Sequence, residues 1–331
     1  MLPSRKARVA RRCAAVVAAA CVLAIAAPDR LCAQSWPSKR VSVVVPFAPG
    51  SATDLLPRTI FEHVAAKVGQ PIIIENRPGG GGAIGVGAVA KAEPDGHTIL
   101  VHSNALVTAP AIQSMPYDPV RDFSGITPLG NVPLVLVISP EKNIKTLKEF
   151  VAAAKAKPGS VNYAAAGIGT PPHLTMERFR LAAGFEGQVV PFKGAPEALT
   201  EILAGRVDVY FCPITPAMPF IKEGKLLALA VSSSKRASAL PFVPTTVEAG
   251  FPDSDFDFWI GMVVPKKTSR DLVARIHQVT IEALTDPSVK EKLAKLGVED
   301  MITTPDEFDA RIAREAPIAA ALAKAAGIAV K

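Results

Sequence analysis

The sequence predicts an α/β protein built from two domains, and three observations lead to this fold class. Runs of apolar, β-branched residues alternate with segments of helical periodicity along most of the chain. About ten strand signals follow residue 36, more than one compact sheet of this length usually needs. The length of 331 residues also fits two domains, at about 150 residues each. Repeated βα units favour a parallel or mixed sheet with helices on its faces.

The first element along the chain is a predicted signal peptide over residues 1–33. Residues 1–12 contain five Arg or Lys and no acid, and residues 13–27 are uncharged and mostly small. A basic segment, a short apolar segment and a small residue at Ala33 are typical of a secretory signal peptide. A membrane anchor would need about 20 apolar residues. The sequence therefore predicts export, with Gln34 as the first mature residue.

Removal of residues 1–33 changes both the charge and the cysteine content. The whole chain has 37 Lys and Arg against 30 Asp and Glu, a net charge of +7. Without six basic residues and one acidic residue, 31 remain against 29, or +2, so nothing indicates a nucleic-acid partner. Cys212 becomes the only cysteine, which excludes an internal disulfide. The five His residues lack zinc-site spacing, and we expect no metal.

The first strand and helix of the mature chain follow directly. Residues 41–47, VSVVVPF, form a β-branched run typical of a buried strand, and residues 55–68 carry apolar residues at helical spacing. Pro57 restricts where this helix can begin. If Asp54 is the N-cap, Pro57 falls at the third helical position, where its missing N–H costs nothing.

The later elements follow the same two patterns. Further strands are predicted at residues 71–76, 97–103, 133–139, 161–167, 188–192, 207–211, 225–232 and 257–264. Further helices are predicted at residues 83–92, 146–156, 170–184, 196–205, 269–285 and 306–325.

The glycine-rich segment before residue 86 has part of the pattern of a nucleotide site. Gly80, Gly82 and Gly85 match GxGxxG between a strand and a helix, but the next strand ends without the acidic residue that holds a ribose. A turn that needs glycine backbone angles explains the segment better. The sequence also lacks a nucleophile elbow, a P-loop and a Cys–His pair, and it has no pair of carboxylates at a spacing that indicates acid–base catalysis. We expect no catalytic residues and no cofactor.

Two strand-to-helix turns remain as candidates for binding, at residues 46–54 and 164–173. Each would direct unpaired backbone N–H groups and the positive end of a helix at a crevice, which suits a carboxylate. In the second turn, Thr170 is the predicted N-cap, followed by Pro171 and Pro172. Because these prolines have no N–H, an anion there would depend on the N–H groups of residues 168–170 and of His173.

Eight ordered segments carry a family resemblance. They are WPSKRVSVVVPFAPGSATDLLPR, ENRPGGGGAIG, PYDPVRDFSGITPLG, GTPPHLTMERF, VPFKGAPEALTEILAGRVDVYF, KLLALAVSSSKR, LPFVPTTVEAGFP and FWIGMVVP. The chain resembles the Bug or TctC-like solute receptors, the extracytoplasmic binding proteins of tripartite tricarboxylate transport systems. The resemblance covers about residues 36–328.

The resemblance implies the class II periplasmic binding protein fold, a Venus flytrap of two α/β lobes, each a mixed sheet flanked by helices. Two crossover strands would join the lobes. It implies a discontinuous N-terminal lobe of residues 34–132 and 257–331, and a second lobe of residues 133–256. We place the crossovers near residues 131–138 and 256–264.

The resemblance also implies a ligand site for a small carboxylate between the lobes, held largely by backbone N–H groups and water. The candidate ligand-binding residues are Phe47, Ala48, Gly50, Ser51, Asp54, Ser103, Asn104, Ala166, Gly167, Ile168, Gly169, Thr170, His173 and Lys193. Asp54 could instead be a plain N-cap, Ser103 and Asn104 could form an ordinary turn, and Lys193 could be a solvated surface residue. For His173, a structural role is slightly favoured.

Two departures from the family pattern bear on the ligand. Ser51 stands where the family has a second glycine, and Pro57 replaces an alanine. Residues 164–166 are alanines where the family has serines. Ala166 offers the ligand no hydroxyl, so we expect a less polar acid, aromatic or short aliphatic.

The sequence therefore predicts a monomeric, periplasmic, non-enzymatic receptor that delivers a small carboxylate to the membrane subunits of a tripartite tricarboxylate-type transporter. Two alternatives remain open: a ligand-sensing receptor without a transport role, and a secreted α/β enzyme.

Overall fold

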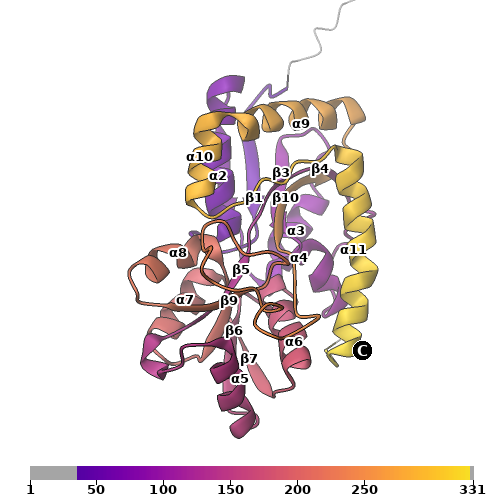
Figure 1. Ribbon diagram of the computed structural model, residues 1–331. Coiled ribbons are helices and arrows are strands. Elements are labelled where there is room, and N and C mark those ends of the chain that lie inside the picture. Colours follow the sequence, from indigo (N-terminus) through magenta and orange to yellow (C-terminus); the bar gives the residue numbers. More distant parts are fainter. Residues whose placement is uncertain (1–35, 329–331) are drawn as a thin grey trace, which may run out of the picture. The chain divides into compact units, whose positions relative to one another are not determined.

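The computed structural model describes residues 36–328, so the predicted signal peptide lies outside the described part of the chain (Figure 1). The strands are β1 (Val41–Val45), β2 (Ile72–Asn76), β3 (Thr98–Ser103), β4 (Phe123–Asn131), β5 (Leu134–Ile138), β6 (Val161–Ala165), β7 (Gly187–Pro191), β8 (Val209–Pro213), β9 (Leu227–Val231) and β10 (Trp259–Pro265). The α-helices are α2 (Ala52–Val68), α3 (Ala83–Ala90), α4 (Ala105–Thr108), α5 (Leu147–Ala156), α6 (Pro171–Ala183), α7 (Ala195–Leu203), α8 (Ile214–Lys222), α9 (Arg270–Thr285), α10 (Pro287–Lys295) and α11 (Pro305–Ala325). The short 3₁₀ turns are η1 (Gly80–Gly82), η2 (Ala109–Ala111) and η3 (Pro140–Lys142).

The first sheet has the strand order β2-β1-β3-β10-β4. β1 is parallel to β2 and β3, whereas β10 runs antiparallel to both β3 and β4. In the sequence, β10 follows all five strands of the second sheet, although it belongs to the first sheet. The first sheet is therefore discontinuous in sequence. Helices α9 and α11 follow β10 and pack on β4 (Figure 1).

The apolar core of the first lobe lies where α3, α4 and α11 cover this sheet. Val86 of α3, Leu106 of α4, Trp259 of β10 and Phe308 of α11 belong to one fully buried cluster. A Cβ atom on Gly125 in β4 would lie 2.8 Å from the Phe308 ring. Glycine therefore lets α11 approach the sheet closely.

The second sheet has the strand order β7-β6-β8-β5-β9. β6 is parallel to β7 and β8, and β5 runs antiparallel to β8 and β9. Helix α6 packs on β6 and β8, while α7 and α8 pack on β5 and β8. Two mixed sheets flanked by helices confirm the predicted α/β two-lobe class.

The two connections between the sheets lie side by side. The chain passes from β4 to β5 near Val132 and returns from β9 to β10 near Phe258. The Val132 N–H donates to the Phe258 carbonyl oxygen at 2.8 Å. This bond ties together the two segments about which the lobes can move.

Several elements differ from the sequence predictions. β4 and the helices α4, α8 and α10 were not predicted. β4 contains Gly125, Pro128 and Gly130, which weaken a strand signal, and α8 contains Pro219 in its interior. In α8 the buried face packed on the sheet outweighs the unfavourable local preference of proline.

The beginning of α2 corrects a second expectation. Ser51, not Asp54, is the N-cap, so Asp54 is the third helical residue and Pro57 lies inside the helix. Pro57 therefore has no N–H to donate to the Thr53 carbonyl, one turn earlier.

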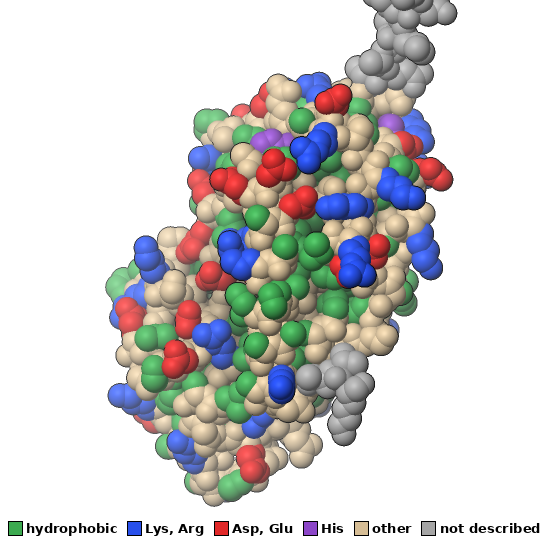
Figure 2. Space-filling model, turned by 90° about the vertical axis from the view of Figure 1, so that its right-hand side faces the viewer, with side chains coloured by type: hydrophobic (Ala, Val, Ile, Leu, Met, Phe, Trp, Pro, Cys, Tyr) green, Lys and Arg blue, Asp and Glu red, His purple; other side chains and the backbone are tan. Residues whose placement is uncertain are grey.

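Charged side chains of both signs are interspersed on the face that Figure 2 shows, where hydrophobic side chains also gather between them. Within residues 36–328, no helix has the length and hydropathy needed to cross a membrane. Cys212, the free cysteine of this part of the chain, is buried in β8, and burial raises the pKa of its thiol.

Candidate ligand-binding site

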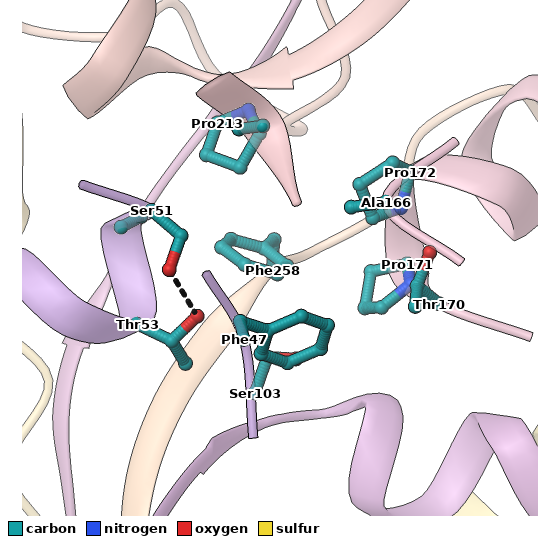
Figure 3. Close-up of a pocket in the computed structure, with 12 residues that line it drawn as sticks. Phe47, Ser51, Thr53, Ser103, Ala166, Thr170, Pro171, Pro172, Pro213 and Phe258 are labelled. Carbon is teal, nitrogen blue, oxygen red and sulfur yellow. Dashed lines mark hydrogen bonds between the residues drawn. The ribbon is translucent and has the colours of Figure 1, made fainter. Parts of the chain in front are cut away.

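A cavity of about 310 Å³, the open space at its mouth included, lies between residues of the two lobes (Figure 3). Its lining has eight apolar and four hydroxyl side chains. They are Phe47, Ala52, Ala166, Pro171, Pro172, Ala195, Pro213 and Phe258, with Ser51, Thr53, Ser103 and Thr170. None of these side chains carries a charge.

Four helices begin at this cavity. Ser51, Thr170 and Pro213 are the N-caps of α2, α6 and α8, and Ala195 is the first residue of α7. Every strand that precedes one of these helices ends at the same place, as strands of an α/β sheet do at a ligand site. The positive ends of four helix dipoles therefore converge on one uncharged cavity, which favours an anion.

Asp54 holds the turn that precedes α2. Its carboxylate accepts hydrogen bonds from the Gly50 N–H at 2.9 Å, from Asn76 Nδ2 at 2.9 Å and from Arg58 Nε at 3.0 Å. Burial alone would raise the pKa of this carboxyl, but the bonds from Arg58, Gly50 and Asn76 together hold it below its usual value. Asp54 does not line the cavity, and all of these bonds shape the loop beside it.

The first-lobe side of the cavity offers hydroxyl groups. Ser51 Oγ and Thr53 Oγ1 lie 3.5 Å apart, as Figure 3 shows, and both side chains are buried. The Ser103 hydroxyl, at the end of β3, accepts from the Ala105 N–H at 3.3 Å and keeps its own proton free to donate.

The start of α6 has the predicted sequence of positions, with Thr170 as N-cap and prolines at the first two helical positions. Of the four predicted N–H donors of this turn, two are in use. The Gly169 N–H donates to His173 Nδ1 at 3.2 Å, and the Thr170 N–H donates to the Gly167 carbonyl at 3.4 Å. His173 is buried and stacks on Tyr163 at 6.2 Å, and burial lowers its pKa. In the structure, His173 supports the turn and does not line the cavity.

A second cavity of about 830 Å³, the open space at its mouth included, adjoins the first, because Phe47 and Ala166 line both. It brings together three further candidates, Gly167, Ile168 and Lys193, with the glycines of η1. The N–H of Lys193 donates to Glu197 Oε2 at 3.0 Å, and its side chain is exposed.

The remaining candidates lie at contacts around the cavities. A Cβ on Gly194 would lie 3.0 Å from Cβ of Ala48, and a Cβ on Gly50 would lie 3.5 Å from the Pro196 ring, so Ala48 and Gly50 lie where the lobes touch. Asn104 donates from Nδ2 to the Asp257 carbonyl at 2.9 Å, beside the return crossover.

Sequence reasoning missed seven lining residues: Ala52, Thr53, Pro171, Pro172, Ala195, Pro213 and Phe258. The starts of α6 and α7 could have been found, since both helices were predicted directly after strands. Pro213 could not, because α8 was not predicted. Phe258 reaches the cavity only because its crossover lies beside Val132.

A family model described as "Tripartite tricarboxylate transporter family receptor" matches residues 56–327. The chain belongs to this receptor family. BugT of Bordetella pertussis (strain Tohama I) is 34% identical over 294 residues, which cover 88% of this chain and 90% of BugT.

Solved structures agree with this assignment. The periplasmic binding protein BugD is 32% identical, with a TM-score of 0.84, and the match covers 89% of this chain and 100% of BugD. Rpa4515 of R. palustris, solved with adipate, is 29% identical, with a TM-score of 0.86 and coverage of 89% and 99%. The tripartite tricarboxylate receptors are solute-binding proteins, so the family assignment and the two-lobe fold point to the same class of function.

Proposed function

We propose that this chain is a periplasmic receptor that captures a small carboxylate in the cavity between the lobes and presents it to the membrane subunits of a tripartite tricarboxylate-type transporter. The observation that carries this proposal is the convergence of four helix starts on a cavity lined by no charged side chain. Helix dipoles and first-turn donors stabilise a carboxylate without a basic side chain. The related Rpa4515 was solved with adipate, itself a small carboxylate.

Capture in this cavity depends on closure of the lobes. The lining comes from both lobes, from Phe47 and Ser51 on one side and from Ala166 and Thr170 on the other. A carboxylate between them would be removed from water, and each electrostatic contact would become stronger. The closed form would then be the form that a membrane partner recognises.

We propose binding without chemical change of the ligand. The residues that line the cavity include no His, Lys, Asp or Glu. The lining hydroxyl groups therefore have no partner there that could activate one of them as a nucleophile. An exported receptor also agrees with the predicted signal peptide.

A ligand screen tests this function. Purified protein is mixed with a panel of mono-, di- and tricarboxylates and followed by thermal shift and calorimetry, and each acid that binds is re-examined by NMR after long incubation. The proposal expects at least one acid to raise the melting temperature and to remain unchanged. Absence of binding by every acid, or conversion of a bound acid, would contradict it.

Transport requires a second measurement. Uptake of the bound acid is compared in cells with and without the gene for this chain. Loss of uptake without the gene is expected. If the purified protein binds the acid but cells without the gene take it up as fast as cells with it, the sensing role would be favoured instead.

A further inference from the structure

A separate groove lies at the β9 edge of the second sheet. Its volume is about 680 Å³, the open space at its mouth included. It is lined by residues of β9, by the segment that leads into α5, and by residues 242–249 of the loop after β9. None of these residues lines either of the two cavities of the ligand site. An occupant of the groove would therefore not compete with the ligand.

The groove is apolar and includes the most exposed large apolar side chain of the described residues. Seven of its ten lining side chains are apolar, and Phe242 lines it while 93% exposed. Single exposed apolar side chains are common on protein surfaces, but this ring adjoins other apolar residues such as Leu229 and Val243. A partner that covers the ring would remove it from water, and aromatic side chains are enriched at the centres of interfaces.

The sheet edge beside the groove is mostly open. β9 is the edge strand, and the loop that follows it pairs only with its last residue. The Val231 N–H donates to the Pro244 carbonyl at 2.9 Å, and the Val231 carbonyl accepts from the Thr246 N–H at 2.9 Å. Within residues 36–328, no strand pairs with the outer edge of residues 227–230. An open edge of this kind can take up a strand from another chain.

The charge of the groove is positive. Lys145 and Lys148 line it, both are exposed, and neither side chain has an ion-pair partner in the described part of the chain. No carboxylate lines the groove. The two acids nearest in sequence already have partners, since Glu149 accepts from the Lys145 N–H at 2.7 Å and Glu248 from Arg236 Nε at 2.7 Å. The groove therefore favours an acidic partner.

We infer, on the basis of the proposed function, that this groove docks an extended segment of a membrane subunit, in which acidic side chains flank an apolar one. The segment adds to the open edge of β9, its apolar side chain packs beside Phe242, and its carboxylates pair with Lys145 and Lys148. In this mode of recognition, main-chain hydrogen bonds supply affinity and the side-chain contacts supply specificity. Ion pairs at the rim mainly speed association.

The position of the groove determines what this contact can report. All of its lining residues belong to the second lobe, so the contact is available in the open and in the closed form. The groove is thus an anchor for the receptor. A membrane subunit that distinguishes the closed form must also contact the first lobe.

Photocrosslinking in intact cells tests the inference. The photoreactive residue p-benzoylphenylalanine replaces Phe242 in the full chain or, as a matched control, Leu181, an exposed apolar residue of α6 outside the groove. Products in the membrane fraction are identified by mass spectrometry. We expect a membrane subunit of the transporter to be crosslinked from position 242 at least tenfold more than from position 181. No product, equal products from both positions, or a product only with lipid or with a second copy of this chain would overturn the inference.

Charge reversal supplies a second readout. Lys148→Glu in the protein that is photoreactive at position 242 should lower the yield of this product roughly fivefold, because it places like charges together. Lys222→Glu, at an exposed lysine of α8 outside the groove, should leave the yield unchanged. An equal effect of both variants, or none with Lys148→Glu, would overturn the inference.

Failure here and failure of the proposed function remain distinguishable. If uptake depends on the gene but no membrane subunit is crosslinked from position 242, the docking inference is wrong and the proposed function stands. If uptake does not depend on the gene, the proposed transport role is wrong, and the inference falls with it.

Discussion

Thr108 donates a hydrogen bond from Oγ1 to the carbonyl oxygen of Gly169 at 2.7 Å. Thr108 ends α4 in the first lobe, and Gly169 belongs to the turn before α6 in the second lobe, so the bond spans the two lobes. Gln113 Nε2 adds a longer bond at 3.2 Å to the Ile168 carbonyl in the same turn. These bonds are made in this arrangement and are lost when the lobes separate.

Thr108→Val should therefore weaken ligand binding. Valine has the shape of threonine but leaves the Gly169 carbonyl without its donor, at a cost of about 1 kcal/mol to the closed form. We expect the dissociation constant to rise roughly fivefold by calorimetry. Thr108→Ser retains the hydroxyl and should bind as the wild type does. Equal affinity of the valine and serine variants would show that this bond does not contribute to closure.

Gly169→Ala should block closure more severely. Gly169 has φ +81°, and a Cβ there would lie 2.9 Å from the Cα of Ala109 in the other lobe. We expect at least a tenfold loss of affinity. Gly205→Ala is the matched control, because Gly205 has φ +68° and no atom within 4 Å of the added Cβ.

Both glycine variants should lose about 1 kcal/mol of stability through backbone strain alone. Urea denaturation measures that common part, and calorimetry measures the affinity. A loss of affinity in Gly205→Ala as large as that in Gly169→Ala would mean that strain, not contact between the lobes, causes the effect.

The sequence predicts what is local and misses what depends on distant partners. The start of α6 could be predicted because Thr170, Pro171 and Pro172 specify a helix start by themselves. The start of α2 could not, because Asp54 and Ser51 are both acceptable N-caps. The choice between them depends on Asn76 and Arg58, which occupy the Asp54 carboxylate.

Part of the site is likewise determined by the tertiary fold. β4 has weak strand propensity but is held between β10 and the helix α11. The same packing brings the β10 crossover, with Phe258, to the cavity. Lys193, an attractive residue for an acid by its charge, lies outside the small cavity and lines the larger one. Spacing along the chain contains no information on which of two adjoining cavities a residue lines.

Asp54→Asn should destabilise the protein and reduce ligand affinity together. The Asp54 side chain is only 2% exposed, and its carboxylate accepts from three donors, so an amide would place N–H groups against N–H groups. We expect a loss of about 2 kcal/mol in the free energy of unfolding. Glu291→Gln, in an exposed pair with Lys295, should change stability by less than about 0.5 kcal/mol. Similar losses in the two variants would contradict the role assigned to Asp54.

Acid should destabilise the protein through His102. This side chain is buried, its Nδ1 accepts from the Ser103 N–H at 2.8 Å, and burial lowers its pKa to about 3. The unfolded chain binds a proton at His102 below about pH 6.5, and the folded chain does so only near pH 3. Stability is therefore retained above pH 6.5 and falls with acidification, by roughly 1.4 kcal/mol per pH unit for this group.

Urea denaturation between pH 4.5 and pH 7.5 measures this dependence. His173, whose pKa is also lowered by burial, contributes with the same sign. The pKa of the Asp54 carboxyl is lowered from its usual value of 3.8, so this group changes the stability only at a pH below that value, outside the range measured. His102→Gln should reduce the pH dependence of the free energy of unfolding by the equivalent of about one proton. An unchanged slope in a folded variant would show that His102 is not the group responsible.

Phe47→Ala should change the length of ligand that the receptor accepts. Phe47 lines both the first cavity and the larger adjoining cavity. Its ring packs edge-on against the His102 ring, with 5.3 Å between the ring centroids. Removal of the ring should join the two spaces and let a longer apolar chain extend toward η1. We expect the affinity for octanoate relative to butanoate to rise at least tenfold, measured by calorimetry on both acids.

Two controls separate this effect from a general loosening of the fold. Phe47→Leu keeps an apolar barrier and should retain most of the wild-type preference, while Phe192→Ala alters only the larger cavity. The free energy of unfolding of each variant is measured alongside, because truncation of a buried Phe costs about 3–5 kcal/mol when no water or ligand fills the space. If Phe192→Ala shifted the preference as much as Phe47→Ala, the barrier between the cavities would not be Phe47. An octanoate preference confined to Phe47→Ala would identify this ring as the group that limits ligand length.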